Sequence, residues 1–222
     1  MIVLALDTST LQATVAVWGR GHVLGERHRV VTTHSDALLL LVDEAFTDAG
    51  IVPHDLDAIV CGAGPGSFTG LRIGLATAKG LCFALEKPLV LISSLAGMAA
   101  RAPSGRVCAT LDAFKGEVYA GLYTIHDGLP VADGEELVLS PADLRARLAA
   151  APVDHVVGSG AAKYPELQVA PLLDHELGPR AADLARLAAV RLARRDFDDL
   201  ATATPKYIRP SEAELVKGKR QR

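Results

Sequence analysis

The chain has 222 residues and a formal net charge of −3, with half of its residues hydrophobic and 22% charged. This balance is typical of a compact globular protein and excludes a disordered chain. The nearly neutral charge excludes a general electrostatic attraction to nucleic acid, so any contact with RNA must be local or come through a partner.

The cysteines and the first residues indicate the compartment. Cys61, Cys82 and Cys108 are odd in number, widely spaced and set in apolar neighbourhoods, which predicts reduced thiols in a cytoplasmic protein. The opening apolar run ends at Asp7 without a basic start or a cleavage pattern, so it predicts a strand and not a signal peptide. No apolar run approaches the roughly 20 residues that span a bilayer, so we expect no membrane segment.

The first half of the chain alternates strand and helix patterns. Apolar runs bounded by polar or glycine-containing turns predict strands, and longer runs with apolar residues at helical spacing predict helices. The expected strands are 2–6, 14–18, 23–31, 56–61 and 89–92, and the expected helices are 35–50, 70–85 and 94–101.

Asp7 and Thr8 directly follow the first strand. In phosphate-handling folds that begin this way, the acid at the end of the first strand faces the cleft. The alternative is that both side chains close a turn through bonds to the backbone. The sequence leaves these two interpretations open.

The segment 62–72 contains four glycines and a proline between a strand pattern and a helix pattern. Glycine accepts positive φ and lets another backbone or an anion approach, and a helix start favours negative charge. Gly64, Gly66 and Ser67 are therefore candidates for a phosphate cradle. The alternative is a tight strand-to-helix turn, because the spacing matches neither GxGxxG nor GxxxxGK[ST].

The two longer helices carry more apolar surface than one sheet needs. Stepping by 100° per residue gives the helix 35–50 one broad apolar face, whereas the helix 70–85 is apolar nearly all round. We predict that one stripe of this surface meets another protein, and complete internal burial is the alternative. The interface candidates are Leu38, Leu41, Leu71, Leu75, Ala78 and Cys82, or the stripe opposite the last four.

The second half restarts the pattern after a loop at 102–105. We expect strands at 107–111, 117–125, 135–139 and 155–157, and helices at 141–151, with Ser140 as N-cap, and at 180–195. The element order predicts an α/β fold of two related lobes with mixed sheets, 1–102 and 103–222. An extended segment at 205–210 precedes a basic tail from Lys217 to Arg222, which is either a solvated end or a tether for phosphate.

Catalytic patterns are scarce. Ser67 lacks the GxSxG spacing of a nucleophile elbow. None of the seven histidines forms an i, i+4 pair within one helix, and no cysteine pair suggests zinc. We therefore predict no catalytic residue, no bound metal and no cofactor of the chain's own.

Five segments resemble the bacterial TsaB (YeaZ) family. They are Leu-Ala-Leu-Asp-Thr-Ser-Thr at 4–10, Thr-His-Ser at 33–35, Gly-Pro-Gly-Ser-Phe-Thr-Gly-Leu-Arg-Ile-Gly at 64–74, Asp112-Ala113 with Gly-Glu-Val-Tyr at 116–119, and Pro205, Tyr207 and Arg209 of a Pro-x-Tyr-x-Arg pattern. The glycine motif is highly specific, and the resemblance runs over essentially the whole chain.

The resemblance implies an actin-like/Hsp70-like ATPase superfamily fold and a role in making threonylcarbamoyladenosine in tRNAs that read codons beginning with adenosine. It implies a non-catalytic subunit that activates the larger paralogue TsaD, which binds metal and transfers the threonylcarbamoyl group. The ATPase TsaE joins the complex, and TsaC-type enzymes make the donor. Contact with tRNA would come through the complex, nucleotide could bind only there, and a homodimer is possible.

This chain also differs from what the resemblance leads us to expect. TsaD-type relatives carry a His-x-x-x-His metal pair, but here Leu38 stands four positions after His34. Asp36 replaces an expected glutamate, and Phe114 and Lys115 replace an arginine-containing pair. Two other functions remain open: a free-standing glycopeptidase or nucleotide phosphotransferase using Asp7, His34 and the glycine loop, and a homodimeric binding module.

Overall fold

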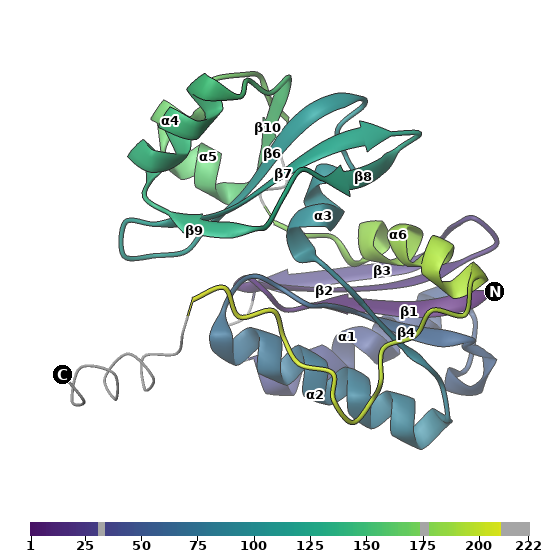
Figure 1. Cartoon of the computed structure of the whole chain (residues 1–222). Helices are drawn as coiled ribbons and strands as arrows, with labels where there is room; N and C mark the ends of the chain where they lie inside the picture. Colours follow the sequence, from purple (N-terminus) through teal and green to yellow (C-terminus); the bar gives the residue numbers. More distant parts are fainter. Residues whose placement is uncertain (31–33, 174–177, 210–222) are drawn as a thin grey trace.

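The computed structural model describes residues 1–30, 34–173 and 178–209, with the side chains of 34–36 excluded. The basic tail and the side chain of His34 therefore lie outside the described residues. Within these ranges the chain forms two lobes, each built on a mixed sheet (Figure 1).

The first lobe is a five-stranded sheet in the order β3-β2-β1-β4-β5. β1 pairs antiparallel with β2 and parallel with β4, so it lies at the centre of the sheet. The sheet accounts for the five strands expected in the first half, with ends shifted by up to two residues. The strands are β1 (Ile2–Asp7), β2 (Gln12–Gly19), β3 (His22–Val30), β4 (Ala58–Gly62) and β5 (Leu89–Ile92).

Helices cover both faces of this sheet. α1 (His34–Ala49) and α2 (Phe68–Leu85) pack on one face, and α6 (Ala181–Ala193) packs on the other (Figure 1). α6 falls in the range expected for the second lobe, yet its alanine-rich stripe lies on β1, β2 and β4 of the first. It follows that the last helix returns to the sheet with which the chain begins.

α2 has the length and hydropathy of a membrane-crossing helix, with 18 residues and a mean hydropathy of 1.2. Core helices of globular proteins pass the same test. Six residues of α2 are buried, and its apolar stripe packs on the sheet together with α1. This packing accounts for the apolar stripe of α2 that faces the sheet.

The second lobe is a six-stranded sheet with the path β11-β10-β6-β7-β8, and β9 also pairs with β7. The short edge strands β8 and β11 and the helix α5 were not expected from the sequence. Ser140 caps α4 as predicted, since its hydroxyl accepts from the backbone of Asp143 across 3.1 Å. The elements are β6 (Gly105–Asp112), β7 (Val118–His126), β8 (Leu129–Ala132), β9 (Leu137–Leu139), α4 (Pro141–Ala150), β10 (His155–Val157), α5 (Ser159–Lys163) and β11 (Leu172–Leu173).

α3 (Ser94–Ala99) joins the lobes, and its residues pack with the second sheet. Gly97 faces Leu184 of α6 so closely that an added Cβ would lie 2.5 Å from the leucine side chain. α4 and α5 cover the opposite face of the second sheet. The lobes therefore meet through α3 and α6, which are in direct van der Waals contact.

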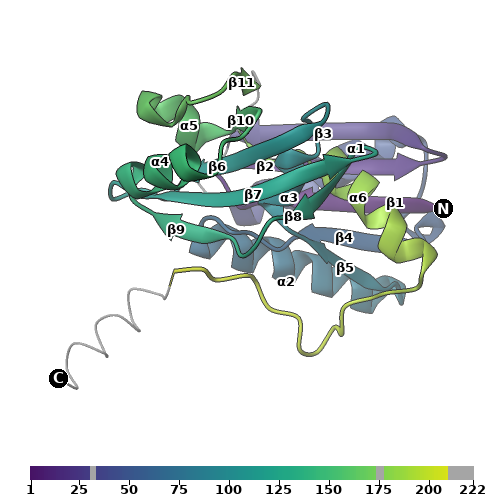
Figure 2. The same cartoon turned by 45° about the horizontal axis from the view of Figure 1, so that its top comes forward.

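The segment 198–209, which we call the strap, runs from the edge of the first sheet along α2 to the second lobe (Figures 1 and 2). Asp198 bridges to Leu89 on β5, and the N–H of Lys206 donates to the carbonyl of Ala63 across 2.8 Å. Arg209 then reaches the carbonyl of Ala113 in the β6–β7 loop at 3.0 Å. The strap thus ties the two lobes together.

Candidate functional site

The five candidates for a phosphate site come together at one edge of the first sheet. β1 and β4 are parallel neighbours, so Asp7 and Thr8 at the end of one lie beside the glycine loop at the end of the other. β5 ends at the same edge and is followed by Ser94. The expected juxtaposition therefore exists, and what it can bind depends on which groups remain available.

Asp7 is only 1% exposed, and protein donors already occupy both of its oxygens. One oxygen accepts from the backbone N–H and the hydroxyl of Ser9, at 2.8 and 2.6 Å, and the other accepts from the hydroxyl of Ser94 at 2.6 Å. Thr8 is equally buried, and its hydroxyl donates to the carbonyl of Gly70 across 2.7 Å. The structure thus favours the turn-closing interpretation, since neither side chain faces the cleft.

The glycines approach the chain itself. A Cβ on Gly66 would stand 2.1 Å from the carbonyl oxygen of Ser9, and one on Gly70 would stand 2.1 Å from that of Thr8. The backbone N–H of Ser67 also donates to the oxygen of Ser9, at 2.7 Å. The turn after β1 therefore packs directly against the backbone of Gly66 and Gly70, where side chains would not fit.

A cleft of about 1090 Å³ opens between the lobes beside this turn. Gly66 and Ser67 line it, whereas Asp7, Thr8 and Gly64 do not. The other walls come from residues 9–12 after β1, the start of α2, the β6–β7 loop and the end of the strap.

The acidic side chains that line this cleft are paired. Asp112 accepts from Lys163 at 2.8 Å, and the same hydrogen bond raises the pKa of the lysine above its ordinary value. Glu117 pairs with Arg209. Each acid is neutralised by a cation of the chain, so the described residues present no free acid–base pair here.

Glu136 is a buried carboxylate that the sequence analysis missed. It accepts from the hydroxyls of Ser93 and Tyr123 and lies 3.3 Å from Lys206 of the strap. Burial, followed by the charge of Glu136, raises the pKa of Tyr123 far above its usual range. A glutamate inside the strand expected at 135–139 was the available signal. Its role here is to join α3, β7 and the strap.

Ser94 was missed as well, although its signal was readable. It follows the third parallel strand of the sheet, and the carboxyl ends of parallel strands share one edge. That rule places it beside Asp7 without any further information.

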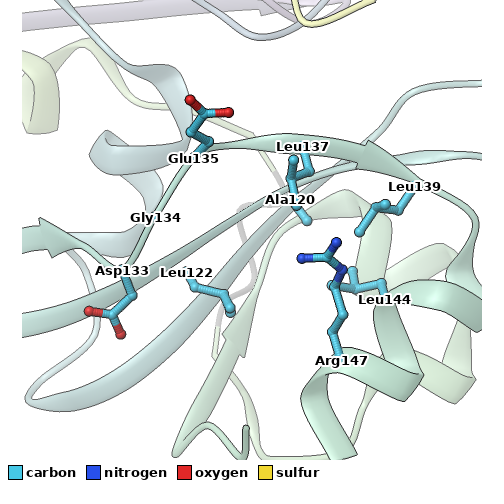
Figure 3. Close-up of a pocket in the computed structure, with 9 residues that line it drawn as sticks. All are labelled: Ala120, Leu122, Asp133, Gly134, Glu135, Leu137, Leu139, Leu144 and Arg147. Atoms are coloured by element: carbon cyan, nitrogen blue, oxygen red, sulfur yellow. The ribbon is translucent and has the colours of Figure 1, made fainter. Parts of the chain in front are cut away.

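A smaller cavity of about 240 Å³ lies in the second lobe between β7, β9 and α4. Figure 3 shows the guanidinium of Arg147 over an apolar lining, with the carboxylates of Asp133 and Glu135 turned away. Asp133 is already paired with Arg106 at 3.1 Å. The apolar lining residues are Ala120, Leu122, Leu137, Leu139 and Leu144. This cavity contains one cation and no catalytic pair.

No group of three or more histidine, cysteine, aspartate or glutamate side chains converges as a metal site in the described part of the chain. The three cysteines are free and buried there.

The six residues predicted to contact a partner are not at the surface of the chain. All six are buried inside the first lobe, where they pack on the sheet or between α1 and α2. Helical periodicity identifies an apolar stripe but does not say whether the chain's own sheet covers it. The six residues are Leu38, Leu41, Leu71, Leu75, Ala78 and Cys82.

The opposite stripe of α2, which the sequence left as the alternative for that helix, is the exposed one, and α1 also exposes two leucines. Phe83 on α2 is 81% exposed, and Leu39 and Leu40 on α1 are 57% and 56% exposed. Ala76 and Gly80 of α2 are exposed beside Phe83. α1 and α2 lie side by side on the same face of the sheet, and we call these five exposed residues of the two helices the outer helix face (Figure 1).

Comparison with known proteins now identifies the family. The family model described as "TsaD: tRNA N6-adenosine threonylcarbamoyltransferase" matches residues 28–214. The chain is 34% identical over 223 aligned positions to the tRNA threonylcarbamoyladenosine biosynthesis protein TsaB of Escherichia coli, covering 96% of each chain. The chain belongs to the TsaB (YeaZ) family. The solved structure of YeaZ from Pseudomonas aeruginosa agrees, with a TM-score of 0.81 at 36% identity over 93% of this chain and 99% of that one.

The fold expected for the TsaB family is also confirmed. The activator of the 2-hydroxyisocaproyl-CoA dehydratase from Clostridium difficile, an actin-like ATPase fold, superposes with a TM-score of 0.51 at 9% identity over 90% of this chain. Two mixed sheets flanked by helices are the shared architecture. The likeness to the dehydratase activator concerns the fold alone.

Proposed function

We propose that this chain is the non-catalytic subunit of a tRNA threonylcarbamoyladenosine-forming complex, and that its outer helix face binds a TsaD-type transferase. The observation that carries the proposal is the outer helix face itself. Phe83, Leu39 and Leu40 present large apolar side chains to solvent on two neighbouring helices, and exposed apolar side chains gathered on one face favour an interaction site.

The small residues beside Phe83 favour helices as the partner elements. Ala76 and Gly80 are exposed on α2, and a Cβ on Gly80 would meet nothing within 4 Å. Small residues let a second helix come close. Because the chain matches the transferase family over residues 28–214, the proposed partner is a paralogue whose own first-lobe helices pack against α1 and α2.

The side chains that could serve catalysis are already bonded within the chain, which supports an accessory role. The carboxylate of Asp7 is engaged by Ser9 and Ser94, and the acids that line the cleft are paired with Lys163 and Arg209. The proposed division of labour gives the chemistry to the transferase and the assembly surface to this chain. TsaE and tRNA then join the pair.

Co-purification with the transferase and a threonylcarbamoylation assay on tRNA test the proposal. Phe83→Glu and Leu40→Glu place a charge in the apolar surface, so we expect transferase affinity to fall more than about tenfold, together with modification of tRNA. Val131→Glu on β8, a residue that is similarly exposed but lies on the other lobe, is the matched control.

Leu71→Glu is not a suitable probe, because Leu71 is buried in the first lobe and its loss would unfold the chain. Two results would overturn the proposal. One is unchanged complex formation by both outer-face variants. The other is ATP turnover or peptide cleavage by the purified chain alone that disappears in Asp7→Ala.

A further inference from the structure

Aromatic side chains from both lobes line the large cleft. Phe68 at the start of α2 and Tyr207 of the strap lie with ring centroids 4.9 Å apart. Phe114 lines the same cleft from the β6–β7 loop. Phe114 is 58% exposed and Tyr207 is 41% exposed, so each presents ring surface that nothing in the described chain covers completely.

The ring of Tyr207 is fixed in place. The guanidinium of Arg72 lies 3.8 Å from the centroid of Phe68, and its Nε donates to the hydroxyl of Tyr207 across 3.0 Å. The strap backbone on either side is tied to Ala63 and Ala113. An aromatic surface held in this way loses little entropy when a flat ring stacks on it.

Phe114 is also held, in an uncommon conformation. Phe114 and Lys115 have φ of 58° and 53°, the left-handed region that side chains other than glycine rarely adopt. The N–H of Ala113 donates to the carbonyl of Glu117, the N–H of Glu117 donates to the carbonyl of Phe114, and Arg209 contacts Ala113, so three bonds maintain this turn. Such residues persist where the surroundings determine them, and they concentrate at ligand-binding sites.

The cleft favours a ring over a phosphate chain. Thr8 and Ser9 pack against the glycine loop, and the N–H of Ser67 donates to Ser9, so this N–H is already used within the chain. Three of the cations nearby are paired with acids, Arg209 with Glu117, Lys163 with Asp112 and Lys206 with Glu136, and Arg72 lies against Phe68 and Tyr207. A ligand would therefore gain affinity mainly from stacking of a flat ring. Any phosphate groups that it carries would remain outside the cleft.

We propose that the mouth of this cleft binds one unpaired RNA base, stacked on Phe114 and Tyr207. Unpaired bases are the part of a folded RNA that proteins recognise by stacking on aromatic rings. That the RNA is a tRNA rests on the proposed function, whereas the stacking site rests on the geometry of this chain alone.

The test uses the full chain and a labelled hairpin RNA with adenosines in its loop, one of them carrying a photoreactive base. We expect crosslinks to the β6–β7 loop and the strap. Phe114→Leu removes the ring and keeps apolar volume, so affinity falls by about tenfold. Phe114→Tyr, which keeps an aromatic ring, should retain the wild-type affinity. Phe197→Leu alters an exposed aromatic side chain outside the cleft and leaves affinity unchanged.

Stacking also predicts a shallow dependence on salt, because few phosphates are neutralised. Any of four results would overturn the proposal: no crosslink; crosslinks confined to the tail 217–222 with a steep salt dependence; equal affinity of Phe114→Leu and wild type; or AMP, or an apolar peptide, binding as tightly as the RNA. The outer-face variant Phe83→Glu separates the two proposals, because it should lose the transferase and keep the crosslink.

Discussion

The backbone N–H of Ser67 donates to the carbonyl oxygen of Ser9 across 2.7 Å, and this bond closes the glycine-rich loop onto the turn that follows β1. The loop has the glycine-rich composition of a ligand-binding loop, but its glycines pack against residues 8 and 9 of the same chain. Its glycines are therefore required for folding, and the first prediction tests this.

Gly66→Ala should destabilise the chain by about 2 kcal/mol or more, because the added methyl would meet the backbone oxygen of Ser9 at 2.1 Å, and a backbone atom cannot rotate away. Gly80→Ala, on the helix α2 that follows the glycine loop, is the comparison variant. It has open space around it, so it should stabilise the chain by about 0.5–1 kcal/mol. Denaturant unfolding measures both, and equal effects of the two variants would contradict the close-approach argument.

Asp7→Asn should cost about 2–4 kcal/mol of unfolding free energy. The carboxylate accepts three hydrogen bonds from Ser9 and Ser94, and an amide turns one acceptor into a donor that faces another donor. Asp127→Asn, in an exposed turn at φ 51°, should be nearly neutral, because asparagine tolerates that conformation. If Asp7→Asn keeps wild-type stability, Asp7 is not the structural carboxylate described here.

The buried thiols predict a loss of stability in alkali. Burial raises the pKa of Cys82 and of Cys108 to about 12. Above pH ~8.5 the unfolded thiols lose their protons while the native ones keep them, so the native state binds more protons and stability falls as pH rises. The slope is about 1.4 kcal/mol per pH unit for each thiol up to the native pKa.

Unfolding free energies at several pH values measure this slope. The double variant Cys82→Ala, Cys108→Ala should show a flatter decline between about pH 9 and 11 than wild type. Parallel declines for the two proteins would show that other groups cause the effect.

Arg209→Ala should loosen the strap and the β6–β7 loop together, because one guanidinium contacts Ala113 and Glu117. We expect a loss of about 1–3 kcal/mol and faster limited proteolysis within the strap. Arg145→Ala removes an exposed arginine of α4 that makes no side-chain bond within the described residues. It should leave the unfolding free energy and the rate of proteolysis unchanged. Unaltered proteolysis in Arg209→Ala would mean that the strap is held by its other contacts alone.

Local patterns predicted the local structure well. The continuous apolar runs placed β1, β4 and β5, and Ser140 with Pro141 placed the start of α4. The edge strand β8 escaped because Leu129–Ala132 is short and contains a proline. Periodicity also located the apolar stripe of α2 but could not assign Leu75 to the core and Phe83 to solvent, since that depends on which sheet the helix covers.

The site was harder to predict because its partners are far apart in sequence. Asp7 and Ser94 are separated by 87 residues, and Arg72 and Tyr207 by 135. Residue types alone suggested an anion site at the glycine loop. Only the pairing of β1 with β4 shows that Ser9 packs against this loop, and only the course of the strap shows that Lys206 binds Ala63 beside it.

The position of α6 has a consequence for synthesis. β1 leaves the ribosome first, yet one face of its sheet stays uncovered until residues 181–193 arrive to pack on Val3 and Ala5. The second sheet, by contrast, has α3, α4 and α5 available before that point. The lobe that is translated first is thus completed last, and the newly made chain must keep an apolar sheet face soluble while most of the protein is still being added.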